Sequence, residues 1–294
     1  LQARGNMDYS ADKLRQKFYA STATALCGMN GRYIEMDYQE TLMYGDVMAM
    51  AKKKLNDFTL NIAIGGSIND KVVNSTRIDS KNASLKFANV FNLANIVMSS
   101  SASIDQKIDA HYQLQSVFAT AQAGYKEGAF LDLTARNDWS STLAYTKYEK
   151  KGFFYPSIGV SFLPDKWVKM PEWVSFSKLR GAYSIVGNGV PPFITYPVSY
   201  VTAGGGMLAS DAAPFAEMKP EMTHSVELGM EWKFLQHRLG LNLTYYRTNT
   251  YEQFFKLPAL AGDKYAYRYV NAGDIQNQGW EITLDATPVL TSDF

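Results

Sequence analysis

The chain has 294 residues, of which 46% are apolar and 19% charged, so it is neither a disordered polymer nor a highly charged one. A formal net charge of +1 argues against a dedicated nucleic-acid binder, which needs a basic excess to neutralise phosphates. The single cysteine, Cys27, excludes an intrachain disulfide and a cysteine-rich metal site. The three histidines are too far apart in sequence for a zinc motif, and no apolar run is long enough for a transmembrane helix. We therefore expect no cofactor and no nucleic-acid partner.

The N-terminal third of the chain carries the weakest pattern. Residues 1–9 resemble part of a strand, and weaker alternation of apolar and polar residues is found at 15–27 and 58–68. Between residues 39 and 112 the alternation cannot be followed from one strand to the next. The sequence predicts strands here without fixing their boundaries.

From residue 116 onwards apolar and polar residues alternate, which predicts strands with one apolar and one wet face. A first hairpin is predicted over residues 116–136, with its turn at 126–128. Further strands follow at 157–162, 178–183 and 281–287.

The clearest hairpin covers residues 225–245. Every even position of 225–234 is apolar, a polar turn follows at 235–238, and every odd position of 239–245 is apolar. The whole chain then contains about ten strands, several of them near the ~9–11 residues that a tilted strand needs to cross a bilayer.

The predicted connections have unequal lengths. Short turns alternate with long segments at 137–152, 187–222 and 250–276. Short turns at one end and long loops at the other are typical of outer-membrane barrels. A soluble sandwich has strands of ~5–6 residues and mostly short connections, but it remains an alternative.

The wet face carries charged residues in mid-strand, opposite the aliphatic ones. A water-filled or plugged barrel lumen accommodates such side chains. The residues predicted to face a lumen are Asp132, Arg136, Lys178, Arg180, Glu227, Glu231 and Glu281.

The sequence contains no convincing catalytic constellation, and we expect no enzymatic activity. Glu227 and Glu231 would lie ~13 Å apart along one strand, which is too far for a glycosidase pair. The glycine run at 204–206 lacks the Lys-Ser/Thr pair and the following helix of a phosphate-binding loop. His237 lies in a hairpin turn, where a solvated histidine is the simpler interpretation.

Aromatic residues are concentrated in the predicted long loops. Such rings can stack on sugars or peptide side chains, or they can pack one loop on another. The candidate extracellular contacts are Phe193, Tyr196, Tyr200, Phe215, Tyr265, Tyr267, Arg268 and Tyr269.

Several segments between residues 113 and 290 resemble, in family order, the SusC/RagA family of TonB-dependent outer-membrane transporters from Bacteroidetes. Residues 1–112 match only loosely, and 89–95 is their best piece. The resembling segments are 124–143 with its Arg-Asn-Asp-Trp-Ser-Ser motif at 136–141, 154–162, 177–188, 219–223, 238–246 and 270–281.

The resemblance implies an all-β fold of long antiparallel meander strands that form part of a large transmembrane β-barrel of about 22 strands. About ten strands cannot close such a barrel. Residues 1–294 are then one incomplete barrel domain, without the family's plug and its TonB-engaging region.

The resemblance further implies import of a large nutrient, an oligosaccharide or a peptide, across the bacterial outer membrane. The implied partners are a SusD-like lipoprotein, TonB and outer-membrane lipid. Two other hypotheses stay open from the residues alone: a self-contained soluble or surface-adhesive β-protein, which would lack an apolar belt, and an outer-membrane enzyme.

Overall fold

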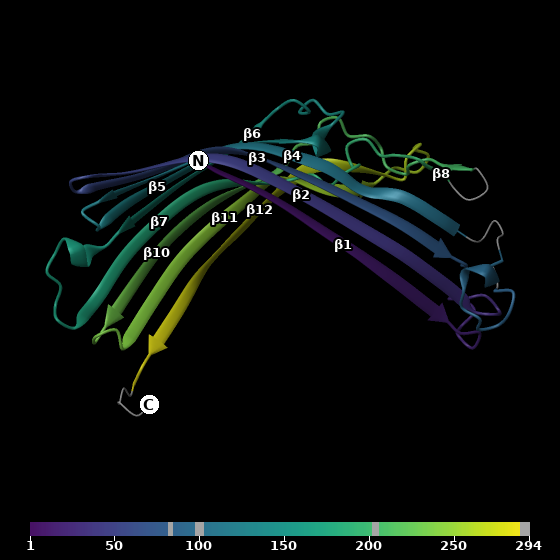
Figure 1. The fold of residues 1–294 in the computed structure, drawn as a ribbon, viewed down its shortest axis with the longest axis horizontal. Coiled ribbons are helices and arrows are strands. Elements are labelled where there is room, and N and C mark those ends of the chain that lie inside the picture. Colours follow the sequence, from purple (N-terminus) through teal and green to yellow (C-terminus); the bar gives the residue numbers. More distant parts are fainter. Residues whose placement is uncertain (82–84, 98–102, 202–205, 289–294) are drawn as a thin grey trace.

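The computed structural model describes residues 1–81, 85–97, 103–201 and 206–288. Ten strands form one antiparallel sheet in which each strand pairs with the next one along the chain (Figure 1). These strands are β1 (Gln2–Phe18), β2 (Arg32–Leu55), β3 (Phe58–Asp79), β4 (Ser103–Tyr125), β5 (Ala129–Ser140), β6 (Phe153–Phe162), β7 (Val174–Asn188), β10 (Glu221–Phe234), β11 (Leu239–Pro258) and β12 (Tyr267–Ala286).

The remaining elements are small. β8 (Tyr200–Val201) and β9 (Met207–Leu208) form a separate hairpin between β7 and β10. Three short 3-10 turns are η1 (Leu93–Asn95), η2 (Ser141–Leu143) and η3 (Pro164–Lys166). In the described part of the chain no helix has the length and apolarity to cross a membrane.

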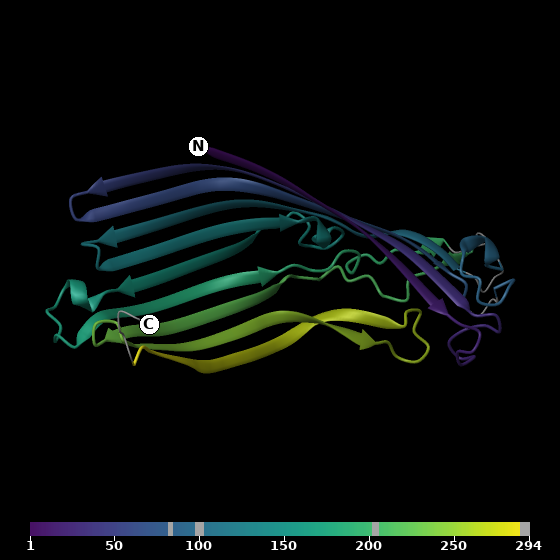
Figure 2. The same cartoon turned by 60° about the horizontal axis from the view of Figure 1, so that its bottom comes forward.

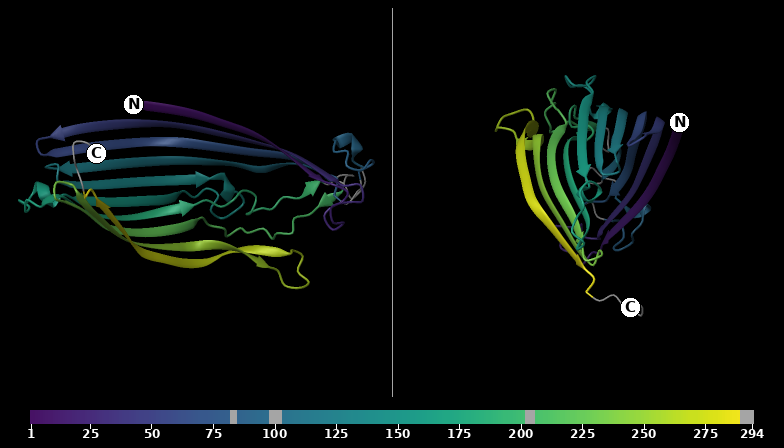
Figure 3. Two further views of the ribbon diagram at one scale, coloured as in Figure 1. Left: turned by 90° about the horizontal axis from the view of Figure 1, so that it is seen from below. Right: turned by 90° about the vertical axis from the view of Figure 1, so that its left-hand side faces the viewer.

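The sheet is a curved trough whose edges are β1 and β12 (Figure 3). It does not close on itself, since the two edge strands pair only with β2 and β11. The predicted all-β meander, part of a larger barrel, is confirmed.

The connections divide between the two ends of the sheet, as predicted. Tight or medium turns at 56–57, 126–128, 163–173 and 235–238 lie at one end, and the longer connections lie at the other (Figure 2). By the rule for outer-membrane barrels, the short-turn end is periplasmic and the long-loop end extracellular. The connections at the long-loop end are 19–31, 80–102, 141–152 and 189–220, together with the shorter 259–266.

The prediction of a long loop at 250–276 is wrong. β11 continues to Pro258 and β12 begins at Tyr267, so only residues 259–266 connect them. The register shifts on either side of Gln253, and Glu252 has a positive φ of 57°. This bulge breaks the alternation of the sequence although the strand continues.

The prediction of a strand at 15–27 is also wrong beyond Phe18. Residues 19–31 form a loop that ends at Gly31, whose φ is +98°. A Cβ at Gly31 would lie 2.6 Å from the Phe18 carbonyl oxygen. Glycine is therefore needed where the chain turns back into β2.

The region in which the alternation could not be followed contains parts of three very long strands, β2, β3 and β4, and the connection 80–102. A register shift between Val73 and Asn74 changes which residues of β3 and β4 share a face. At ~3.3 Å per residue, β2 is far longer than a bilayer is thick. The part of β2 near the long-loop end therefore extends beyond the membrane. It carries polar residues on both faces, which hides the alternation of apolar and polar residues.

At the long-loop end, β2 and β3 support a small folded layer. Tyr33, Leu85 and Ile96 form a buried cluster there. The fully buried Asp79 carboxylate accepts hydrogen bonds from Arg32 (2.8 and 2.7 Å), Arg77 (2.7 Å) and the Lys81 backbone (2.8 Å). This carboxylate fixes the end of β3 against the start of β2.

Candidate functional site

One face of the sheet is polar. Residues that are partners across an antiparallel pair lie on the same face. Asp132 is linked in this way to Glu227 through Gly159 and Ala182, and Arg180 is linked to Glu281 through Gly229 and Thr244. Lys178 is the direct partner of Glu231.

Arg136 lies on the same face as Asp132, because the two are separated by an even number of residues on β5. The register thus brings all seven predicted polar residues to one face. Buried side chains in mid-sheet, such as Asp46, Ser116 and Thr244, lie on this face as well. Crowding of side chains marks it as the concave face.

Hydrogen bonds join the concave face into a network across strands. Arg136 donates to Ser116 (2.6 Å) and to Asp138 (2.7 Å). Further along the sheet Arg180 donates to Thr244 (2.6 Å) and lies 3.4 Å from Glu227. The Arg-Asn-Asp-Trp-Ser-Ser motif therefore serves, at least through Arg136, to order this face.

The opposite face is apolar and exposed. On β3 it runs from Phe58 to Ile68 and stops at Asp70, and the facing residues of β4 to β12 continue it. Its exposed members include Ile62, Ile64, Val117, Leu133, Ile158, Val160, Leu179, Leu228, Trp280, Ile282 and Leu284. Such a continuous exposed apolar band is typical of a surface that contacts lipid.

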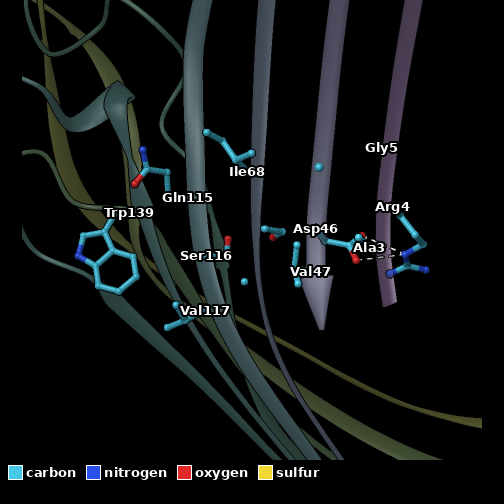
Figure 4. Close-up of a pocket in the computed structure, with 13 residues that line it drawn as sticks. Ala3, Arg4, Gly5, Asp46, Val47, Ile68, Gln115, Ser116, Val117 and Trp139 are labelled. Carbon is cyan, nitrogen blue, oxygen red and sulfur yellow. Dashed lines mark hydrogen bonds and ion pairs between the residues drawn. The ribbon is translucent and has the colours of Figure 1, made fainter. Parts of the chain in front are cut away.

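A hollow lies on this apolar face and not on the polar one. It has a volume of about 810 Å³ and is lined by small residues, among them Ala3, Gly45 and Gly66, with Trp139 at its side (Figure 4). The Arg4–Asp46 ion pair (3.0 Å) lies across the strands on the other face. The hollow therefore reflects the small side chains on this outer surface, and Gln115 adds a polar side chain to its lining.

A second layer closes over the long-loop end of the trough. Leu143, Val190 and Met218 are buried together, although they come from two different loops. The residues that pack on them are Tyr148, Phe153, Ile194, Phe215, Phe254 and Tyr269. Because Phe254 and Tyr269 belong to β11 and β12, this cluster joins the loops to the far strands of the sheet.

The predicted loop contacts therefore differ in their surroundings. Phe215 and Tyr269 pack within the loop layer, so their first role is structural. Tyr196 is 55% exposed, and Arg268 is exposed. Phe193, Tyr265 and Tyr267 are half-buried, and the side chain of Tyr200 lies outside the described part of the chain. Tyr267, Arg268 and Tyr269 belong to β12 rather than to a loop.

The structure adds a ring that sequence reasoning missed. Tyr145, which is 71% exposed, lies beside Tyr196 with 4.9 Å between ring centroids. Between them the buried Thr195 hydroxyl approaches the Thr142 and Ala144 carbonyl oxygens (3.3 and 3.1 Å). This contact fixes the two loops together and holds both rings toward solvent. No sequence signal links the two tyrosines.

Sequence reasoning also missed Asn271, whose polar side chain fixes the same loop layer to the sheet. The Asn271 side chain accepts from the Lys219 backbone N–H (3.0 Å) and donates to the carbonyl oxygens of Lys219 and Glu252 (3.1 and 2.6 Å). The Lys219 ammonium donates to the Glu252 carboxylate (2.8 Å), and this hydrogen bond raises the pKa of Lys219. The β11 bulge at Glu252 makes the arrangement possible, and a bulge leaves no reliable sequence signal.

In the described residues no group of three or more His, Cys, Asp or Glu side chains is arranged to hold a metal ion. The arrangement instead offers a polar trough, an apolar outer face and a fixed loop layer with exposed tyrosines. It is suited to lining an aqueous path through a membrane, and it presents aromatic rings at the mouth of that path.

The model of the family described as "TonB dependent receptor-like, beta-barrel" matches residues 1–293, and the chain belongs to this family. Two relatives from Formosa agariphila are TonB-dependent receptor P26, 28% identical over 193 residues, and TonB-dependent receptor P3, 26% identical over 192 residues. Each alignment covers 62% of this chain and 19% of the relative. The family places the chain in the bacterial outer membrane.

Solved structures share the fold. The structure of the RagAB peptide transporter matches with a TM-score of 0.80 and 19% identity, over 99% of this chain and 32% of that one. A ferric enterobactin receptor from Pseudomonas aeruginosa matches with a TM-score of 0.55 and 14% identity, over 95% of this chain and 38% of that one. The chain thus spans about a third of the matched transporter chain, and these identities support the fold alone.

Proposed function

We propose that this chain is the barrel segment of a transporter that imports a large nutrient, an oligosaccharide or a peptide, through the outer membrane. The observation that carries the proposal is the division of one sheet into a concave polar face and an exposed apolar face. A membrane-embedded barrel needs this division, because lipid contacts one face and an aqueous path the other.

Energy for the import would come through TonB, and a SusD-like lipoprotein would cover the extracellular mouth. A transporter that binds a scarce nutrient tightly needs an energy-driven step to release it, since a high-affinity ligand dissociates slowly. The loop layer built on Leu143, Val190 and Met218, with Tyr145 and Tyr196 exposed on it, is the surface proposed for the ligand or the lipoprotein. The likeness to the RagAB peptide transporter supports the fold, and the choice between glycan and peptide is left to experiment.

The alternative of a self-contained soluble or adhesive β-protein predicts a surface without an apolar band. The exposed aliphatic face and the family match both argue against it.

Replacing residues 196–214 by a short Gly-Ser linker tests the proposal in the full-length protein. The cut ends are close, because the Phe215 N–H donates to the Thr195 carbonyl oxygen at 3.0 Å. We expect normal assembly in the outer membrane but a loss of most growth or uptake on the cognate nutrient, measured with purified oligosaccharides and peptides in parallel. Unchanged uptake of every nutrient that the intact protein imports would contradict the proposed role of this loop.

A further inference from the structure

A group of aromatic rings lies at the periplasmic end of the apolar face. Phe58 at the β2–β3 turn stacks on Tyr125 at the end of β4 (4.5 Å between centroids). Trp167, in the β6–β7 connection, lies 5.3 Å from Tyr125 and 6.0 Å from Phe162. The amphipathic rings among them, Tyr125 and Trp167, favour the depth at which acyl chains give way to headgroups.

Lys126 lies beside these rings, and Lys53 lies on the neighbouring part of the apolar face. The Lys126 ammonium lies 5.4 Å from the Tyr125 centroid and 5.9 Å from that of Trp167. Lys53 is the register partner of Leu60, which lies on the apolar face, and Lys53 is exposed. A lysine in that position extends its ammonium from the apolar surface toward the nearest polar layer.

The local charge is positive. Residues 52–57, the turn 126–128 and the connection 163–173 contain six lysines and four carboxylates. One carboxylate, Asp165, is directed to the Ser177 N–H and hydroxyl (3.3 and 3.4 Å). Two others make long, exposed contacts, Asp57 with Lys126 (3.9 Å) and Glu127 with Lys54 (4.0 Å). Because these contacts are long, the ammonium groups of Lys126 and Lys54 can still donate hydrogen bonds to an anion that binds more tightly than these carboxylates.

The neighbouring β10–β11 turn differs. Its cation, Arg238, already donates to the carbonyl oxygens of Thr287 (3.2 Å) and Pro288 (2.5 Å). The excess of available positive charge is therefore concentrated beside β2 to β6 rather than spread evenly along this end of the sheet.

We propose that Lys53, Lys126 and the rings of Phe58, Tyr125 and Trp167 form a binding site for an anionic phospholipid of the periplasmic leaflet. The two ammonium groups hold the headgroup phosphate, and the acyl chains lie along the rings and the apolar face above them. Charge complementarity selects the lipid, since a zwitterionic headgroup carries its own cation and gains less from these lysines.

Brominated lipids test this assignment. The full-length protein is reconstituted in bilayers of phosphatidylcholine and phosphatidylglycerol, with only one of the two lipids brominated at a time. The quenching of Trp167 is isolated by subtracting the signal of the Trp167→Phe variant. We expect phosphatidylglycerol to be enriched at least about fivefold beside Trp167 at low salt, since each lysine near an anionic surface contributes about this factor. Added salt should lower the enrichment.

In the double variant Lys53→Gln/Lys126→Gln the enrichment should fall close to one. The matched control Lys150→Gln/Lys264→Gln removes two exposed lysines from the opposite end of the sheet and should leave it unchanged. Each single variant is measured as well, so a double variant that fails to assemble leaves the test intact. Equal quenching by both lipids in the unmodified protein, or an enrichment that survives loss of the lysines, would overturn the assignment.

Discussion

Replacing Leu133 by lysine should strongly impair assembly of the protein in the outer membrane. Leu133 is 42% exposed and lies in the middle of the apolar face of β5. A lysine that faces lipid near the middle of a bilayer costs about 2–4 kcal/mol in a membrane barrel. We expect folded, heat-modifiable protein in the outer membrane to fall at least tenfold, measured on unheated gels of purified membranes.

The matched control is Thr134→Lys, one residue along the same strand. Thr134 is exposed too, but it lies on the concave face with Asp132 and Arg136. A lysine there faces water and should leave the amount of folded protein almost unchanged. In a soluble protein both substitutions would be tolerated, so equal tolerance would refute the assignment of the two faces.

Replacing Asp79 by asparagine should loosen the extracellular layer over β1 to β4. The change leaves the Arg32 and Arg77 guanidiniums without their shared carboxylate. Removing one partner of a fully buried ion pair lowers stability by about 3–5 kcal/mol. Because both arginines are partly exposed, we expect this layer to lose roughly 2 kcal/mol of stability. Faster hydrogen exchange at the amides of Lys86, Phe87 and Asn95 would report it, while the exposed Asp105→Asn control should exchange like the unmodified protein.

The same carboxylate predicts a dependence on pH. Burial alone would raise the pKa of Asp79, but hydrogen bonds from Arg32 and the Lys81 N–H, with the charges of Arg32 and Arg77, outweigh it and hold this pKa below its usual value. A lowered folded-state pKa means that the stabilisation is complete above the unfolded value of about 3.9 and is lost only as pH falls through the folded value. Protection of these amides that disappears between pH 6 and 5 would contradict this account.

The alternation of residues was enough to predict much of the sheet. Where one face meets lipid and the other water, as in residues 225–245, every second residue must be apolar, so the hairpin and its faces could be predicted together. The seven mid-strand polar residues reach one face for the same reason. No long-range information was needed.

The long strands of the N-terminal part could not be predicted from alternation, and the reason is physical. Above the membrane both faces of β2 are wet, so alternation is no longer required of them. A register shift at Val73 and Asn74 also changes the period between β3 and β4, as the bulge at Glu252 does in β11. The pairing of Tyr145 with Tyr196 depends on hydrogen bonds between distant loops, and such contacts leave no periodic trace.

The most direct test of the central account labels single cysteines at residues 131–135 in the full-length protein, with Cys27 replaced by serine, in intact outer membranes. A small charged methanethiosulfonate reagent reacts only with thiols that reach water. The account predicts reaction at positions 132 and 134 and protection at 131, 133 and 135. Equal reaction at all five positions, or reaction at 131, 133 and 135 alone, would show that the apolar face of this sheet does not lie against lipid.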